Sequence, residues 1–479
     1  MLRHLVVFLP GIMGSILQKD GRDVWAPSRQ ALWTLFETGG NALTELQVAG
    51  EDGRTDDLGD GIRADRLVRD TVLQVPRLIE HSGYGPLLDQ LPEFLEIRPG
   101  SVQAPRDEAS FYPFPYDWRR DNRVSARRLQ RFVENQLPRW RDWSGAQDAK
   151  VILIGHSMGG LVARYYVEVL GGWKHTLALI TIGSPHRGSL GALDMLSNGI
   201  PKLKRIFDVG QLVRSFESAY QLLPTYRALQ VDDDYLRVVE APALPNIDPA
   251  RAAAARQDFF EAMRLAREVH LNEPGYDPNL LVPWVGTRQE TWQSARLQDG
   301  RITASYAAPP GLAPELADGD GTVPRISAIP AALEGKRLER FAAERHGWLT
   351  NNPMCLDPLL QTIRQIGAGR SSTDFHGSVD GVGGASIGLG LEGLFACDET
   401  PTAILRVYEA RRPMVLRVSL QPTAPECPRQ TLDLTLQPDE SRTVAFETLA
   451  PGQYVLTVSP ADRFSPGPPP VHGVFEVLP

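Results

Sequence analysis

Short, continuous runs of apolar residues recur along the first part of the chain, and periodic apolar stretches lie between them. Four runs are typical of strands buried on both faces, and they cover 4–9, 151–154, 177–182 and 281–285. Apolar residues spaced three or four positions apart predict helices over 125–137 and 161–170. Strands that alternate with helices indicate an α/β fold with a mostly parallel sheet.

A long insertion separates the third and fourth predicted strands. Within it, apolar residues recur at steps of three and four, and they include Phe207 and Phe216. This spacing predicts a wide apolar stripe on one or two helices. We therefore expect a helical cap over about 186–275, whose apolar side packs on the main domain as ordinary core, lines a ligand pocket, or does both.

The pattern changes in the last part of the chain. Residues 367–396 are rich in glycine and serine, which predicts a flexible linker. A small antiparallel β-sandwich is then expected over 397–479, because six short and mostly alternating segments are separated by turn signals: 404–408, 415–420, 432–436, 444–446, 454–458 and 473–477. The sandwich carries no catalytic spacing, so we expect a binding or stabilising module joined to a domain that spans 1–366.

The composition is that of an ordinary soluble globular protein. The 479 residues are 42% hydrophobic and 23% charged, which leaves ample length for a large core and two domains. A formal net charge of −8 argues against a nucleic-acid partner and against general affinity for anionic lipid. No apolar run approaches the roughly 18 residues of a membrane span, so we expect no transmembrane segment and at most transient contact with a membrane surface.

The N-terminus and the cysteines bear on the compartment. The first apolar run is short and ends at Pro10–Gly11, so we interpret it as a buried strand rather than a signal peptide. Cys355, Cys397 and Cys427 are odd in number and far apart, which fits neither metal-ligand spacing nor a disulfide framework. Reduced thiols, no metal and a cytoplasmic location are the resulting expectations.

Arginines are frequent between 119 and 141. We interpret them as the solvated face of a helix, and a patch for lipid headgroups is the alternative.

The most specific chemical signal is Gly155-His156-Ser157-Met158-Gly159, which lies between a predicted strand and a predicted helix. A sharp strand–turn–helix places the serine side chain outside the backbone, and the flanking glycines leave room for the turn. At a helix N-terminus the serine also lies where partial positive charge favours a developing oxyanion. Because a free serine is a poor nucleophile, Ser157 needs partners.

In this architecture the acid and the histidine follow the serine along the chain. Asp320 lies in a glycine-rich turn directly before Gly-Thr-Val, so we prefer it to Asp318 as the acid. Of the three histidines that follow Asp320, His376 lies in the predicted linker and His472 lies in the predicted sandwich. His346 remains as the predicted base, and the glycine after it is typical of a turn.

The first predicted strand runs into Leu-Pro-Gly-Ile-Met-Gly-Ser at 9–15. A strand that ends in Pro-Gly presents a backbone N–H just past the sheet edge. One oxyanion donor in such folds comes from the residue after the nucleophile, and the other comes from a loop of this kind. We therefore assign the donors to the backbone N–H groups of Met158 and Ile12.

These segments together resemble the lecithin:cholesterol acyltransferase family, which includes phospholipid:diacylglycerol acyltransferases and lysosomal phospholipases A. The Tyr-Asp-Trp-Arg segment is the most specific feature, because nucleophile elbows are shared by many hydrolases. The resemblance covers about 1–366 and rests on five features in matching order: 9–15, Phe-Pro-Tyr-Asp-Trp-Arg at 114–119, 155–160, Gly-Asp-Gly-Thr-Val-Pro at 319–324, and His346.

The resemblance implies an α/β-hydrolase fold, no metal, no cofactor, and a triad with two oxyanion donors: Ser157, Asp320 and His346 with Ile12 and Met158. It also implies acyl-ester chemistry on lipids through an acyl-enzyme. Two departures limit it, because the signal peptide and disulfides of the secreted members are not seen here, and the C-terminal sandwich is not part of the family core.

Three further residues are candidate substrate contacts. Trp118 matches the family segment, and the resemblance implies that it helps to shape the substrate site. Phe207 and Phe216 belong to the predicted cap, whose apolar side is suited to an acyl chain.

The predicted function is therefore that of a serine-dependent lipid acyl-ester hydrolase or O-acyltransferase. Water resolves the acyl-enzyme in a lipase or phospholipase, and an alcohol resolves it in an acyltransferase, which the sequence does not decide. Two alternatives are an esterase or amidase acting on a non-lipid substrate, and a catalytically idle binding protein on a hydrolase scaffold.

Overall fold

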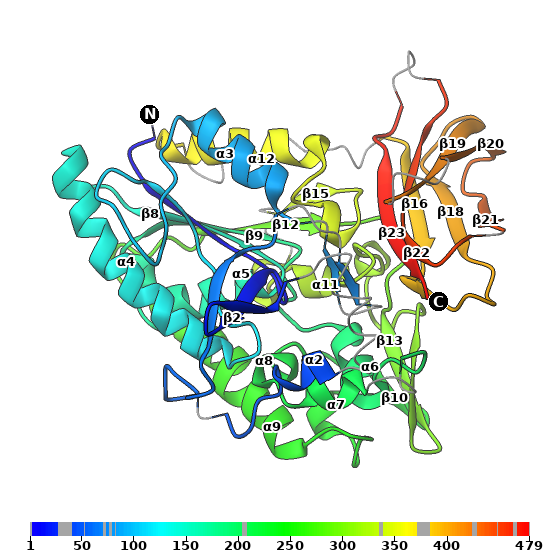
Figure 1. Cartoon of the computed structure of the whole chain (residues 1–479), viewed down its shortest axis with the longest axis horizontal. Coiled ribbons are helices and arrows are strands. Elements are labelled where there is room, and N and C mark those ends of the chain that lie inside the picture. The colour runs from blue at the N-terminus through cyan, green and yellow to red at the C-terminus, as the bar shows by residue number, and fades with distance from the viewer. Residues whose placement is uncertain are drawn as a thin grey trace.

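The structure is a computed structural model, and it describes residues 2–26, 41–51, 53–69, 73–75, 79–81, 83–203, 208–334, 339–370, 384–423, 429–447, 449–462 and 467–478. An α/β part with a cap contains the N-terminal and central segments, and the C-terminal β-sheets lie beside it (Figure 1).

Six parallel strands form the central sheet, in the order β15-β12-β9-β8-β1-β7. The predicted strands are confirmed as β1 (Leu5–Leu9), β8 (Val151–His156), β9 (Thr176–Ile182) and β12 (Leu281–Gly286). Two short edge strands were not predicted: β7 (Phe111–Pro113) and β15 (Arg340–Ala342). Every residue of β1, β8 and β12 is buried, as expected for strands covered on both faces.

Helices cover both faces of this sheet, and side chains of β1 alternate between them. Val6 and Phe8 pack in one core cluster with α3 (Gly85–Leu95) and α12 (Pro353–Gly367). The other residues of β1 pack in a second cluster with α4 (Asn122–Ser144) and α5 (Met158–Glu168). The predicted helix over 125–137 lies within α4, and the one over 161–170 overlaps α5, which ends at Glu168, so the α/β fold class is confirmed.

Smaller elements lie outside the central sheet. A three-stranded antiparallel sheet lies in the order β3-β2-β4 and a two-stranded one pairs β5 with β6. Their bounds, and those of two short helices, are β2 (Ser15–Lys19), β3 (Arg22–Trp25), β4 (Ile62–Leu67), β5 (Leu73–Val75), β6 (Ile79–His81), α2 (Asn41–Thr44) and α11 (Arg325–Ala328).

The cap combines helices with a small sheet, whereas the sequence predicted helices alone. Its helical elements are α6 (Leu190–Asn198), α7 (Val209–Arg214), α8 (Glu217–Tyr220), α9 (Pro249–Ala254), a π-helical segment over 255–261 and α10 (Ala262–His270). Its sheet contains β10 (Leu229–Val231), β11 (Asp234–Leu236), β13 (Ser294–Gln298) and β14 (Arg301–Ser305). Because β13 and β14 follow β12, the cap uses residues beyond the expected limit of 275.

The last eight strands, which we call the C-terminal β domain, form two sheets around their own core. The sheet orders are β16-β18-β21 and β17-β23-β22-β19-β20. All six predicted strands are present: β18 (Thr402–Tyr408), β19 (Met414–Pro422), β20 (Gln430–Leu436), β21 (Ser441–Ala445), β22 (Gly452–Pro460) and β23 (Val471–Val477).

The predicted linker over 367–396 requires correction at its C-terminal end. There the chain forms β16 (Ser386–Leu391) and β17 (Leu394–Phe395), which belong to the C-terminal β domain. Residues 371–383 lie outside the described residues.

Within the described ranges, no helix has the length and apolar character that crossing a membrane requires. Cys355 is buried and Cys397 is exposed, both as free thiols, and Cys427 lies outside the described residues.

Candidate active site

Ser157 lies in a sharp turn between β8 and α5, as the sequence predicted. Its φ of 53° and ψ of −125° are unusual for a residue with a side chain, and its backbone N–H donates to the Ile182 carbonyl at 2.8 Å. A Cβ added at Gly155 would lie 2.4 Å from the Gly160 Cα, and one at Gly159 would lie 2.4 Å from the Pro10 carbonyl oxygen. The turn therefore requires glycine at both positions.

Asp320 and His346 meet through their side chains. His346 Nδ1 lies 2.7 Å from Asp320 Oδ2, and both side chains are buried. The other carboxylate oxygen, Oδ1, accepts the backbone N–H groups of Thr322 at 3.0 Å and Val323 at 2.6 Å. Two backbone donors on one oxygen and the imidazole on the other fix the carboxylate in one orientation and leave His346 Nε2 for a reacting proton.

The neighbouring acid has different partners. Asp318 Oδ2 accepts the Arg288 backbone N–H at 3.1 Å, and its other oxygen lies 3.9 Å from the Arg325 guanidinium. Burial raises the pKa of Asp318 above its usual value. Of the two acids in the turn, Asp320 is therefore the one that contacts the histidine.

The His346 ring lies beside the serine turn. Its centroid is 4.9 Å from that of His156, which directly precedes Ser157. A Cβ added at Gly183, the residue after β9, would lie 3.0 Å from both His346 Nδ1 and Asp320 Oδ2. Glycine at this position lets the Asp320–His346 pair pack directly against the end of the sheet.

The loop after β1 also reaches the serine. A Cβ added at Gly11 would lie 3.0 Å from the Ser157 Cβ and 3.5 Å from its Oγ. The loop closes on itself, because the Gly14 N–H donates to the Gly11 carbonyl at 3.0 Å. Among the described residues, the backbone N–H groups of Ile12 and Met158 have no hydrogen-bond acceptor. Two unpaired donors next to the hydroxyl are what an oxyanion hole requires.

A hydrogen-bond chain through Tyr84 and His156 links this loop to the His346 segment. The Gly11 N–H donates to Tyr84 Oη at 2.7 Å, and Tyr84 Oη lies 2.9 Å from His156 Nδ1. His156 Nε2 donates to the His346 carbonyl at 3.2 Å, which makes Nδ1 the acceptor of the Tyr84 hydroxyl. Burial raises the pKa of Tyr84, so the hydroxyl stays protonated and can donate.

The sequence analysis identified neither Tyr84 nor His156 as part of this hydrogen-bond network. His156 stands inside the recognised turn motif, but its neighbours there gave no sign of a hydrogen-bond partner. Tyr84 lies in a segment without any motif, and no pattern in the sequence points to it.

The predicted substrate contacts Trp118 and Phe216 lie together, with ring centroids 5.6 Å apart. Both are fully buried, and Trp118 Nε1 donates to the Ser15 carbonyl at 3.0 Å. In this structure they pack in the core next to the segment that follows the loop after β1. Phe207 lies outside the described residues.

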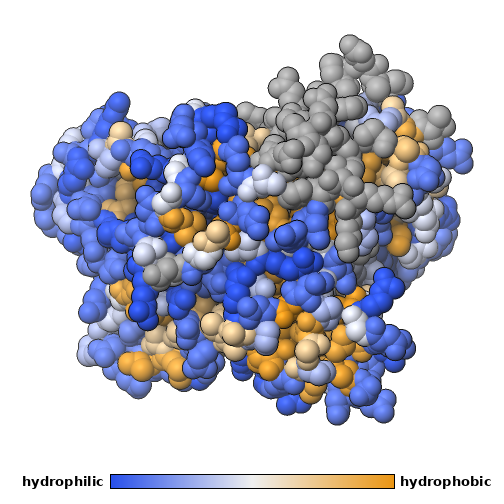
Figure 2. Space-filling model, turned by 60° about the horizontal axis from the view of Figure 1, so that its bottom comes forward, coloured by the Kyte–Doolittle hydropathy of each residue, from blue (hydrophilic) through white to orange (hydrophobic). Residues whose placement is uncertain are grey.

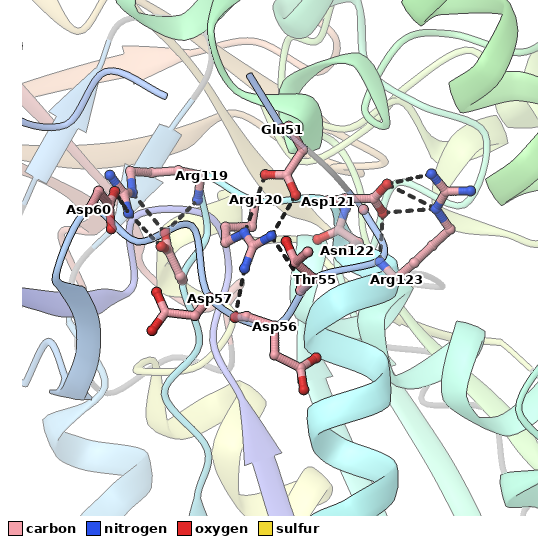
Figure 3. A network of polar contacts seen from close by, with 12 residues as sticks. Glu51, Thr55, Asp56, Asp57, Asp60, Arg119, Arg120, Asp121, Asn122 and Arg123 are labelled. Atoms are coloured by element: carbon pink, nitrogen blue, oxygen red, sulfur yellow. Dashed lines mark hydrogen bonds and ion pairs between the residues drawn. The ribbon is translucent and has the colours of Figure 1, made fainter. Parts of the chain in front are cut away.

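The family segment around Trp118 is a structural junction (Figure 3). The fully buried Arg119 binds Asp117 at 2.6 Å and Asp60 at 2.9 Å. Arg120 binds Glu51 at 2.8 Å and is also buried. The solvated helix face expected from 119 onward is therefore wrong at its start, because these two arginines are paired with carboxylates inside the protein.

The same segment also contacts the loop that follows β1. Tyr116 Oη donates to the Pro10 carbonyl at 2.8 Å, and the Tyr116 N–H donates to Ser15 Oγ at 3.1 Å. Ser218 of α8 donates to the Trp118 carbonyl at 2.6 Å, which ties the cap to the same point.

The parallel sheet, the serine turn after a central strand, and the acid and histidine on later loops define an α/β-hydrolase fold. The family model of lecithin:cholesterol acyltransferase matches residues 106–239, so the resemblance to that family is confirmed over the segment with Trp118 and Ser157. No curated protein sequence matches the chain.

Two solved structures illustrate more distant similarity. The lipase BlEst2 of Bacillus licheniformis in its propeptide form is 11% identical, with 99% of this chain and 93% of that chain covered and a TM-score of 0.29. Phospholipase PlaB of Legionella pneumophila in complex with thio-NAD is 10% identical, with 99% and 89% covered and a TM-score of 0.26.

Proposed function

We propose that the protein is a serine-dependent acyl-ester hydrolase or O-acyltransferase that acts on lipids. The observation that carries the proposal is the buried Asp320–His346 pair, 2.7 Å apart, beside the strained Ser157 turn. Strain at a non-glycine residue is typical of functional sites. The match to the lecithin:cholesterol acyltransferase family supports acyl transfer to water or to an alcohol.

In the proposed mechanism, His346 Nε2 takes the Ser157 hydroxyl proton as Oγ attacks the ester carbonyl. Asp320 holds the imidazole through Nδ1 and stabilises the imidazolium that forms. The N–H groups of Ile12 and Met158 bind the oxyanion of the tetrahedral intermediate. His346 then donates the proton to the leaving alcohol, and water or an acceptor alcohol resolves the acyl-enzyme by the reverse sequence.

A lipid substrate fits the exposed apolar side chains of the cap. Four apolar side chains of the cap are each at least 39% exposed: Val239, Leu265, Val269 and Leu271. Figure 2, in which the bottom of Figure 1 comes forward, shows apolar patches on this face of the molecule. We propose that the cap makes transient contact with lipid surfaces.

The test compares Asp320→Asn with Asp318→Asn on short and long acyl esters, with and without an acceptor alcohol. Asp320→Asn should lower kcat by about 10⁴-fold because the amide can donate to Nδ1, which favours the imidazole tautomer whose Nε2 carries the proton and cannot act as base. Asp318→Asn is the matched control, with the same chemical change in the same turn, and it should lose far less. Equal losses in the two variants would count against the assignment.

A fluorophosphonate label separates the alternatives. Labelling of Ser157 with turnover of lipids supports the proposal, whereas labelling with turnover of small esters or amides alone supports a non-lipid hydrolase. Absence of labelling at Ser157 in the folded protein supports the binding protein.

A further inference from the structure

The C-terminal β domain contacts the segment that holds His346 and is linked through Gln289 to the segment that holds Asp320. Glu344, two residues before His346, is almost completely buried. His472 of β23 approaches its carboxylate twice, with the backbone N–H 3.3 Å from Oε1 and Nδ1 3.2 Å from Oε2. On the other side of His346, the Trp348 and His472 rings stack with centroids 4.6 Å apart. The domain thus touches the histidine segment before and after His346.

Glu344 joins these contacts to the histidine segment itself. Its Oε1 accepts the Arg345 backbone N–H at 2.8 Å, and its Oε2 accepts Asn352 Nδ2 at 2.6 Å. A buried carboxylate is stable only when its oxygens are paired in this way. His472 therefore supplies further partners of the Glu344 carboxylate, which also binds Arg345 and Asn352 on the two sides of His346.

Strand β16 contacts the same region from another direction. The buried Arg345 donates through Nη1 to the Leu389 carbonyl at 2.8 Å. Gln289 donates through Nε2 to the Ile387 carbonyl at 3.2 Å and accepts the Leu389 N–H at 2.9 Å. The Gln289 backbone N–H donates to the Gly319 carbonyl at 3.0 Å, next to Asp320. One strand of the domain thus binds the histidine segment directly and is linked to the acid segment through Gln289.

We propose that the C-terminal β domain is a positioning element for the acid–base pair, with His472 as its principal positioning residue. The inference rests on the proposed roles of Asp320 and His346. No residue of the domain touches the reacting atoms in this proposal. Its contribution is to hold the imidazole and the carboxylate in the geometry that proton transfer requires, since small displacements of reacting groups slow catalysis strongly.

The test uses three variants of the full chain. His472→Phe keeps a ring on Trp348 and removes the Nδ1 donor to Glu344, whereas His472→Asn keeps a donor near that position. Glu399→Gln is the matched control, because it removes another contact of the domain, the 2.6 Å ion pair with Lys202, away from the acid–base pair. Activity on a soluble ester, hydrogen exchange of 340–352 and Tm are measured for each.

His472→Phe should lower kcat about 10-fold with KM changed by less than about twofold, and should speed exchange in 340–352. His472→Asn should restore most of both, and Glu399→Gln should change neither. The proposal is overturned if His472→Phe matches the wild type in kcat and exchange, or if Glu399→Gln changes them equally. If the wild type shows no Ser157-dependent turnover, the proposed function fails, and the exchange measurement still tests the contact.

Discussion

The proposed nucleophile side of the site, Ser157 with Ile12, lies at the central sheet. The proposed acid–base side, Asp320 with His346, lies on loops, and the C-terminal β domain contacts the loop of His346. Ser157 directly follows the buried strand β8, and Ile12 lies three residues after the end of the buried strand β1. Asp320 and His346 lie on loops whose neighbours include β16 and β23. In the proposed mechanism, a serine placed by the sheet works with a base on a loop that the C-terminal β domain contacts, so the two sides can be perturbed separately.

The largest expected effect tests whether the two sides act as one unit. Ser157→Ala and His346→Ala should each lower kcat by about 10⁴-fold or more, and the double variant should be no worse than either alone, because each change removes the same proton transfer. Steady-state kinetics on one soluble ester measures this. Additive losses would show that the two residues act independently.

The next effect concerns the support of the nucleophile side. Arg119→Met removes a fully buried guanidinium and leaves the half-buried Asp117 without that partner, so the free energy of unfolding should fall by about 3–5 kcal/mol. Arg22→Met removes an exposed pair with Glu45 and should cost less than about 1 kcal/mol. Denaturant unfolding of both variants makes the comparison. Similar costs would contradict the structural role of the Arg119 junction.

Tyr84 links the two sides, and its removal should affect both stability and rate. Tyr84→Phe removes the acceptor of the Gly11 N–H and the donor to His156, so we expect about 1–3 kcal/mol of lost stability and a roughly 10-fold lower kcat. Tyr112→Phe is the matched control, since Tyr112 Oη donates to the Arg106 carbonyl at 2.8 Å away from the site. It should lose stability and keep kcat, and a loss of kcat in it would undermine the link.

The smallest expected effect concerns the stability of the C-terminal β domain. Burial raises the pKa of Glu476 in β23 to about 7, from an ordinary value of 4.5. A folded-state pKa above the unfolded one gives stability that is complete below pH 4.5 and is lost as pH rises through 7. Glu476→Gln should therefore match the wild-type Tm at pH 4 and exceed it at pH 8. If the Tm of Glu476→Gln equalled that of the wild type at pH 8 as well as at pH 4, the prediction would be contradicted.

Much of the nucleophile side could be predicted because its signals are local. The apolar runs of β1 and β8 are typical of buried strands, and the Gly-x-Ser-x-Gly spacing is a local signal. Gly155 packs against Gly160 in the same turn, and Gly159 packs against the Pro10 carbonyl after β1. Asp320 and His346 could be selected from their order along the chain, which a known architecture dictates. Their contact with each other could not be derived from any local pattern.

The contacts of the acid–base side with the C-terminal β domain could not be predicted. Glycine and serine in 386–391 resemble a linker, yet a Cβ at Gly388 would lie 2.6 Å from the Tyr408 ring and one at Gly390 2.2 Å from Glu290. These glycines permit close packing in a strand rather than flexibility. The burial of Arg119 and Arg120 could likewise not be predicted, because Asp60 and Glu51, which bind them, lie far away in the sequence.

The most direct test of the central claim is a crystal structure of the protein after reaction with a fluorophosphonate. The account predicts phosphorus bonded to Ser157 Oγ, a phosphonyl oxygen within about 2.7–3.1 Å of the Ile12 and Met158 backbone nitrogens, and His346 Nε2 facing the adduct. An adduct on another residue, or a phosphonyl oxygen directed away from both nitrogens, would contradict it.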